Sequence, residues 1–154
     1  MDIIILAVGK LRSYYREACD EYGTRLQRYA SVDEREIREG RGKTSTEIER
    51  DESRRLSEKL PQRVLLVALT REGKGWSSTD LAAQLERWML ASRPVAFAVG
   101  GSTGLGSNLV EHADHRWSLG PLTLPHELAR VVLYEQLYRA FTIVRGEPYH
   151  KGKP

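Results

Sequence analysis

The sequence has little of what a disulfide-bonded, metal-binding or membrane-spanning protein needs. Cys19 is the single cysteine among 154 residues, so neither an internal disulfide nor a metal site with several cysteines can form. The apolar run at residues 3–6 is too short for a signal peptide or a membrane span. Asp2 precedes it, where a signal peptide would carry Lys or Arg. These absences predict a cytoplasmic protein that binds no membrane.

An excess of charge of one sign is also missing. The formal net charge is +3, with 40% hydrophobic and 29% charged residues, which is the balance of an ordinary globular domain. Such a mildly basic surface permits a nucleic-acid partner but does not require one. The length of 154 residues suffices for a substantial core, so we expect a single domain over residues 1–154.

Apolar runs that alternate with amphipathic segments predict the fold class. Strands are expected at residues 3–8, 63–69, 95–99 and 116–119, with 32–37 as a candidate edge strand. Helices are expected at 14–29, 46–60, 78–93, 109–113 and 126–144, with N-caps at Ser13, Thr46 and either Ser77 or Ser78. The strand runs are too apolar for a sheet with one wet face. This order predicts an α/β fold with a mainly parallel sheet.

The last helix, at residues 126–144, is apolar on every side of a helical wheel. A helix of this kind needs cover all round. The sheet can cover one face, and in so small a domain a second copy of the chain is the natural cover for the other. This helix alone therefore predicts a homodimer.

Two strands that end in glycine and proline loops predict a ligand crevice. The strand at 95–99 runs into Gly100 and Gly101, and the strand at 116–119 runs into Gly120 and Pro121. Proteins of the α/β class bind ligands where neighbouring strands end. The glycines of residues 101–106 follow the order GxxGxG and not the GxGxxG of dinucleotide sites, which counts against a nucleotide-dependent oxidoreductase.

Two other motifs begin a known pattern without completing it. Gly42 and Lys43 resemble the end of a phosphate-binding P-loop, but the glycine required five residues before Gly42 is replaced by Ile37. His112 and His115 resemble part of a metal cluster, but no third ligand is obvious. We therefore expect a solvated basic loop, surface histidines and no metal ion.

The end of the chain carries Tyr149, His150 and Lys151. One interpretation is a frayed terminus after Gly146. The other is contact with single-stranded RNA, because these residue types combine stacking, proton transfer and phosphate binding. The residues alone leave both open.

Four blocks of sequence, in this order, are similar to a known family. They are IIILAVGKLR, FAVGGSTGL, SLGPLTLPHELARVVLYEQLYRA and GEPYHK, and together they span residues 3–151. They resemble the RlmH (YbeA) family of ribosomal large-subunit pseudouridine N3-methyltransferases, which belongs to the SPOUT class. The resemblance implies an α/β fold with a C-terminal trefoil knot, a homodimer, bound S-adenosylmethionine and a 23S rRNA substrate in the ribosome.

The same resemblance implies where the cofactor binds. By matching position, its contacts fall on Leu69, Gly100, Leu119, Gly120, Pro121, Leu122, Thr123 and Leu124. The leucines would supply apolar walls for the adenine. Gly100 would let the backbone approach the ligand closely.

The residues that would act on the RNA are less well defined. The acceptor nitrogen of pseudouridine holds a proton that a base must remove, and His126, Glu135 and His150 are candidates by residue type, with water as an alternative. Arg130 and Arg139, with Lys10, Arg12, Lys151 and Lys153, could hold the rRNA backbone. The candidate catalytic residues are therefore His126, Arg130, Glu135, Tyr149 and His150. A non-catalytic module that binds ribosomes or RNA is the alternative function.

Overall fold

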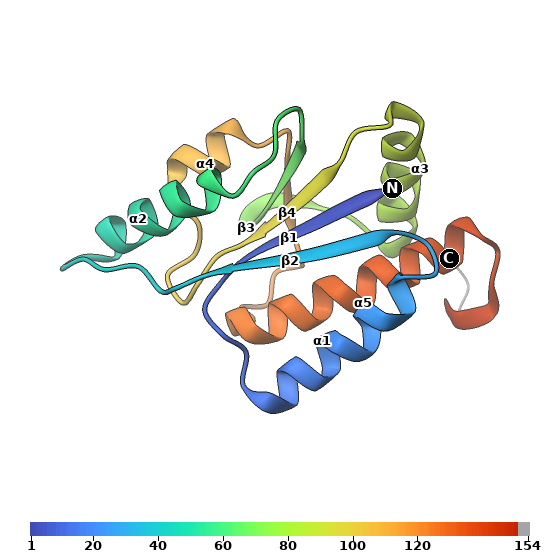
Figure 1. Cartoon of the computed structure of the whole chain (residues 1–154), viewed down its shortest axis with the longest axis horizontal. Helices are drawn as coiled ribbons and strands as arrows, with labels where there is room; N and C mark the ends of the chain where they lie inside the picture. The colour runs from blue at the N-terminus through green and yellow to red at the C-terminus, as the bar shows by residue number, and fades with distance from the viewer. Residues whose placement is uncertain (151–154) are drawn as a thin grey trace.

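A five-stranded sheet, with strand order β2-β1-β4-β3-β5, forms the middle of the molecule (Figure 1). In this computed structural model, which describes residues 1–150, the strands are β1 (Asp2–Val8), β2 (Ser31–Ile37), β3 (Leu65–Gly75), β4 (Val95–Val99) and β5 (His115–Ser118). Every neighbouring pair is parallel. The predicted α/β class and parallel sheet are confirmed, and the candidate edge strand is β2.

Helices cover both faces of the sheet, as the apolar strands require. They are α1 (Ser13–Leu26), α2 (Ser45–Glu58), α3 (Ser78–Ala91), α4 (Ser107–His112) and α5 (His126–Val144), and a short 3₁₀ turn η1 (Pro148–His150) follows. Helices α2 and α4 pack together on one face, whereas α5 packs against α1 and α3 on the other (Figure 1). Among residues 1–150, no helix is long and apolar enough to span a membrane.

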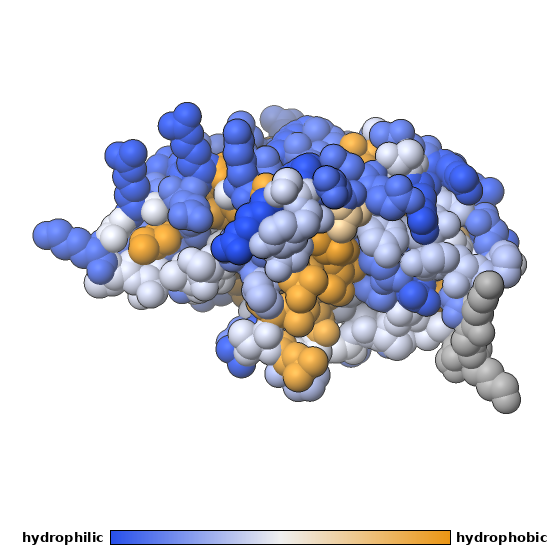
Figure 2. Space-filling model, turned by 90° about the horizontal axis from the view of Figure 1, so that it is seen from below, coloured by the Kyte–Doolittle hydropathy of each residue, from blue (hydrophilic) through white to orange (hydrophobic). Residues whose placement is uncertain are grey.

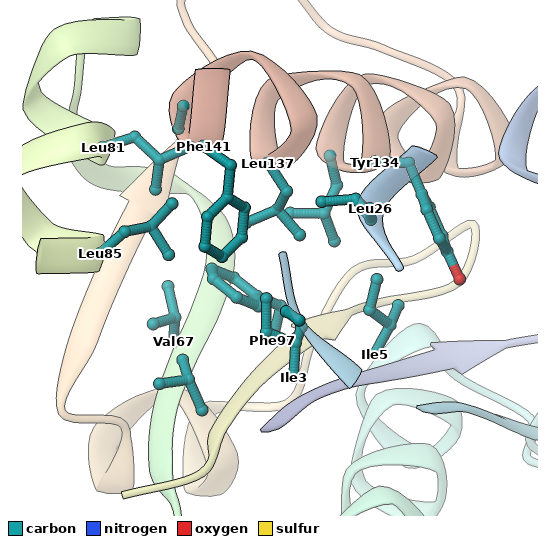
Figure 3. Close-up of a cluster of buried hydrophobic side chains, with 14 of the residues drawn as sticks. Ile3, Ile5, Leu26, Val67, Leu81, Leu85, Phe97, Tyr134, Leu137 and Phe141 are labelled. Carbon is teal, nitrogen blue, oxygen red and sulfur yellow. The ribbon is translucent and has the colours of Figure 1, made fainter. Parts of the chain in front are cut away.

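Alternate residues of each strand supply two separate cores, because successive side chains in a strand point to opposite faces. Ile3 and Ile5 of β1 belong to the core under α1, α3 and α5, whereas Ile4 and Leu6 belong to the core under α2 and α4. In the larger core, Phe97 of β4 lies among side chains from three helices (Figure 3).

The helix starts agree with the expected positions in part. Ser77 caps α3 in a full capping box with Asp80, as predicted. The expected cap of α2 at Thr46 is wrong: Thr44 accepts from the Glu47 backbone N–H at 3.2 Å. Ser13 is the first residue of α1 and not its cap. The residue at the cap position is Arg12, whose backbone N–H donates to the Glu127 carboxylate of α5. Ser and Thr caps were therefore predicted correctly by residue type for α2 and α3, whereas a contact with α5 takes the place of a side-chain cap at α1.

Strand β3 is six residues longer than expected at its C-terminal end. Leu69 and Lys74 both pair with Trp117, so residues 70–73 form a bulge between two stretches of the same ladder. Gly73 holds the bulge against β5, because a Cβ there would lie 2.7 Å from the backbone carbon of Arg116. The polar residues after Leu69 were predicted to end the strand, and the bulge explains why pairing resumes beyond them.

Other helices of the same chain cover much of α5. Its buried residues include Leu133, Tyr134, Leu137, Tyr138, Ala140 and Phe141, and α1 and α3 flank the helix. Tyr134, for example, reaches across to β2, where its hydroxyl donates to Glu34 at 2.8 Å. The apolar surface of α5, from which a homodimer was predicted, is therefore partly covered by other helices of the same chain.

Cys19 offers a test of the packing between α1 and the sheet. The residue is buried, and burial raises the pKa of its thiol to about 12, so about one thiol in ten thousand is ionised at pH 8. We expect a disulfide reagent at pH 8 to label the native protein only as fast as it unfolds, and to label it at once in denaturant. Immediate labelling of the native protein would contradict this packing.

Candidate active site

A cavity of about 590 Å³ lies where β4 and β5 end, beside the bulge of β3. Its lining comes from residues 69–71, 99–104, 117–120 and 122–126, together with Ala129. The carboxyl ends of parallel strands meet at one edge of a sheet, which is why these three turns converge. The volume falls within the range of small-molecule sites.

Most of the expected cofactor contacts line this cavity. Leu69, Gly100, Leu119, Gly120, Leu122, Thr123 and Leu124 are all part of its wall, whereas Pro121 is not. Leu122 is 77% exposed, so it stands at the open side and could be covered by a bound molecule. The predicted grouping of these positions is therefore present, although their role as ligand contacts stays a prediction.

The glycine turn after β4 is closed by its own backbone. The Gly104 N–H donates to the Gly101 carbonyl at 3.0 Å, and Gly104 has a positive φ of 89° that favours glycine. A Cβ on Gly100 would lie 2.5 Å from the Gly104 carbonyl carbon. Gly100 is therefore required for the turn to fold against itself. The expected reason, close approach of the ligand, is not needed to explain it.

Helix α2 holds this turn from behind. The Ser53 hydroxyl accepts from the Gly106 N–H at 2.7 Å, and Ser53 is fully buried. Beside it, Glu52 is 3% exposed, and burial raises the pKa of its carboxyl. Sequence reasoning missed both residues, because α2 reads as a charged surface helix and nothing in its spacing marks one acid as buried.

The basic loop at residues 40–43 is not a phosphate cradle. The backbone N–H groups of Gly40 and Lys43 donate to the carboxylates of Glu52 and Glu47, at 2.8 and 2.6 Å. These donors, which a P-loop would direct at phosphate, are already bound to acids of α2. Rejection of the P-loop is thereby supported, but the loop is tied to the fold and not simply solvated.

Two buried polar atoms of the cavity wall have no hydrogen-bond partner among residues 1–150. They are the indole Nε1 of Trp117 and the hydroxyl of Thr103. Buried polar groups are rarely left unpaired, since each costs about 1–3 kcal/mol. Both atoms are shielded from solvent and so belong to the packed part of the wall, behind its accessible surface. Sequence reasoning did not single out either residue.

Among the five candidate catalytic residues, His126 is the one that lines the cavity. It is the first residue of α5 and is partly exposed. The next residue, Glu127, is buried and accepts from the Arg12 backbone N–H at 2.9 Å. This contact fixes the start of α5 against the loop after β1, and with it the position of His126.

Arg130 lies inside the protein, being 1% exposed. Its Nη2 donates to the carbonyl oxygens of Val8 and Gly9, at 3.0 and 2.9 Å, and its Nη1 pairs with Glu36 at 2.5 Å. The guanidinium therefore joins α5 to the ends of β1 and β2. In the single chain it does not reach the cavity, and it has the contacts of a residue that holds the site in place.

The remaining candidates gather further along α5. The Glu135 carboxylate accepts from Arg139 at 2.9 Å and from the Tyr149 hydroxyl at 3.2 Å. The Tyr149 ring meets Tyr138 edge-to-face at 4.6 Å, and burial raises the pKa of Tyr149 to about 12. Glu135 lies nine positions after His126 in α5, which places it about 13 Å further along the helix axis. One chain does not bring Glu135, Tyr149 and the adjacent His150 to its own cavity.

No three His, Cys, Asp or Glu side chains within residues 1–150 are close enough to hold a metal ion. His112 contacts the Asn108 carbonyl through Nδ1 at 2.6 Å. The His115 ring lies beside Trp76 and Trp88, with centroid distances of 5.6 and 5.7 Å. Both histidines thus have structural contacts, and His115 is not a free surface residue.

Comparison with known proteins places the chain in a family. Residues 1–150 match the family model described as "Predicted SPOUT methyltransferase". The chain belongs to this family. The matched residues include every segment that lines the cavity, so the cavity lies within the part of the chain that belongs to the family.

The chain is also similar over nearly its full length to curated relatives. A protein of Syntrophotalea carbinolica is 46% identical, over 97% of this chain and 99% of the relative. One of Rubrobacter xylanophilus is 47% identical over 95% and 96%, and one of an Anaeromyxobacter species is 43% identical over 98% and 100%. All three relatives are named "Ribosomal RNA large subunit methyltransferase H".

Proposed function

We propose that this enzyme uses S-adenosylmethionine to methylate N3 of a pseudouridine in 23S rRNA of the large ribosomal subunit. The observation that carries the proposal is the cavity at the ends of β4 and β5 and the bulge of β3, in a chain of the SPOUT methyltransferase family. Its relatives named for the ribosomal large subunit support this substrate. Acting on ribosomes, the enzyme belongs in the cytoplasm.

The cavity wall has the chemistry that the methyl donor requires. Leu69, Leu119 and Leu124 offer apolar contact to an adenine, and the backbone of residues 119–124 offers N–H and C=O groups. When bound, S-adenosylmethionine supplies an electrophilic methyl group. The task of the chain is to align that methyl with the attacking nitrogen, which by itself accounts for much of the acceleration.

His126 is the residue best placed to manage the proton of the acceptor nitrogen. Within residues 1–150, His126 and Arg71 are the two ionisable side chains of the cavity wall, and no carboxylate lines it. A neutral imidazole can accept a proton near pH 7, whereas a guanidinium cannot. We assign the role of general base to His126, at the edge of the cavity.

The site is completed, in this proposal, by a second copy of the chain. Figure 2 shows a hydrophobic patch on the side of the molecule where α1 and α5 lie. Val131 and Val132 of α5 are only partly buried within one chain. Glu135, Tyr149 and His150 lie away from their own cavity, so they can serve catalysis if a homodimer brings them to the partner's cavity.

The path of the chain supports a trefoil knot within a single domain. Strand β5 lies at the edge of the sheet, yet α5 packs against α1, α3 and the central β4. The connection at residues 119–125 must therefore return past the bulge of β3 and the end of β4, with which it shares the cavity. We propose that it threads between them. A crystal structure that traces α5 around the outside of these turns would exclude the knot.

Calorimetry and a methylation assay together test the function. We expect the purified protein to bind S-adenosylmethionine, and to transfer its methyl group to one pseudouridine when given ribosomes, isolated large subunits or free 23S rRNA. Mapping of the methylated nucleotide identifies the acceptor. A non-catalytic RNA-binding module would bind ribosomes but not the methyl donor, and that result would overturn the proposal.

A further inference from the structure

The bulge of β3 brings one arginine into the wall of the cavity. Residues 70–73 leave the ladder between two contacts with Trp117, and Arg71 in this bulge lines the cavity. Bulges often direct a side chain toward an active site. Here the bulge is fixed on both sides, because pairing resumes at Lys74 and Gly73 packs against the backbone of β5.

The acid next to Arg71 is directed elsewhere. The Glu72 carboxylate accepts from the Thr70 hydroxyl at 2.6 Å, and Glu72 is not part of the cavity wall. Arg71 forms no direct ion pair within residues 1–150, although the Thr70 hydroxyl, helped by the charge of Arg71, lowers the pKa of Glu72. An arginine without an acidic partner, at the wall of a cavity that has no carboxylate, is suited to bind an anion.

We propose that Arg71 binds the α-carboxylate of the methyl donor, an inference that rests on the proposed function. S-adenosylmethionine carries an ammonium, a sulfonium and a carboxylate, and of these a guanidinium can pair only with the carboxylate. Arg71 lies two residues beyond Leu69, a wall of the proposed adenine site, and both residues line the same cavity, with Arg71 exposed at its open side. Arg71 is thus a specificity residue for a donor that keeps its amino-acid end.

The test compares two probes in the unmodified protein and in its variants. Calorimetry measures the dissociation constants of S-adenosylmethionine and of 5′-methylthioadenosine, which lacks the amino-acid end. We expect Arg71→Met to weaken binding of S-adenosylmethionine by about 10- to 100-fold and to leave binding of 5′-methylthioadenosine unchanged. Arg71→Lys, which keeps the charge but not the fork, should fall between the two.

Lys74→Met is the matched control. Lys74 is an exposed cation on the same strand, outside the cavity wall, so its loss should change neither dissociation constant. Equal weakening by Arg71→Met and Lys74→Met would show a general effect of charge and overturn the assignment. The circular dichroism spectra and melting temperatures of all three variants verify that they fold.

The remaining outcomes separate this inference from the function on which it rests. If Arg71→Met leaves the affinity for S-adenosylmethionine unchanged but raises the KM for ribosomes, Arg71 contacts RNA phosphate and the inference is wrong. If both affinities are unchanged and KM is also unchanged, Arg71 contacts no anion and the inference is again wrong. If the unmodified protein binds neither probe, the proposed function itself fails.

Discussion

Gly100→Val is expected to weaken binding of S-adenosylmethionine by about 100-fold or more, which corresponds to about 2.7 kcal/mol. The new Cβ alone would lie 2.5 Å from the Gly104 carbonyl carbon and 2.7 Å from the Leu105 nitrogen. These are backbone atoms, so no side-chain rotation can relieve the overlap and the turn must open. The wall that this turn contributes to the cavity would be displaced, and calorimetry measures the loss.

Gly75→Ala is the matched control for this substitution. Gly75 also lies at the end of a strand, but it is outside the cavity wall and no heavy atom lies within 4 Å of the position of its Cβ. We expect its affinity to equal that of the unmodified protein. The overlap is confined to the turn, and α2 contacts the turn only from behind, so the helices should stay intact. A far-UV circular dichroism spectrum of Gly100→Val should therefore show the normal helix content. Unchanged affinity in Gly100→Val would remove this turn from the binding site.

Arg130→Met should cost about 3 kcal/mol of folding free energy and lower the melting temperature by about 6–12 °C. The substitution leaves the carbonyl oxygens of Val8 and Gly9 without their donor and removes a buried partner of Glu36. Glu36 keeps its contact with Arg16 at 3.2 Å, which limits the loss. Denaturant titration followed by circular dichroism measures the change directly.

Arg139→Met provides the comparison on the same helix. Arg139 pairs with Glu135 one turn earlier, their side chains are 30% and 17% exposed, and ion pairs at this spacing on a helix contribute less than about 1 kcal/mol. Arg130→Lys should lose less than Arg130→Met, because a lysine keeps the charge and part of the hydrogen bonding. If Arg130→Met were as stable as the unmodified protein and lost only methylation, Arg130 would be catalytic and not structural.

The sheet and most of its helices could be predicted because burial leaves a direct trace in sequence. Residues 3–8 and 95–99 are apolar without interruption, and they form β1 and β4 with bounds that differ by one residue at most. The extension of β3 left no such trace. Residues 70–73 are polar because they leave the ladder, and polarity was the signal used to end the strand.

The site was predictable where backbone geometry demands glycine, and less so where side chains act through distant contacts. Gly100 and Gly120 marked the turns that form the cavity wall. Arg130 was predicted to hold the rRNA backbone, because a cation can pair with phosphate. The same helix is apolar all round, however, and an arginine in such a helix must find partners inside. An arginine in a helix that is apolar on every side was therefore the signal that could have predicted a buried, structural role for Arg130.

The bulge between Leu69 and Lys74 also separates what this edge of the protein recognises from what keeps it folded. Both flanking residues pair with Trp117, so the strand resumes its alignment beyond residues 70–72, which make no ladder contacts. Gly73 packs closely against the backbone of β5. Three consecutive positions beside the cavity can therefore be exchanged at little risk to the sheet, which makes them a natural starting point for evolving or engineering a preference for a different methyl donor.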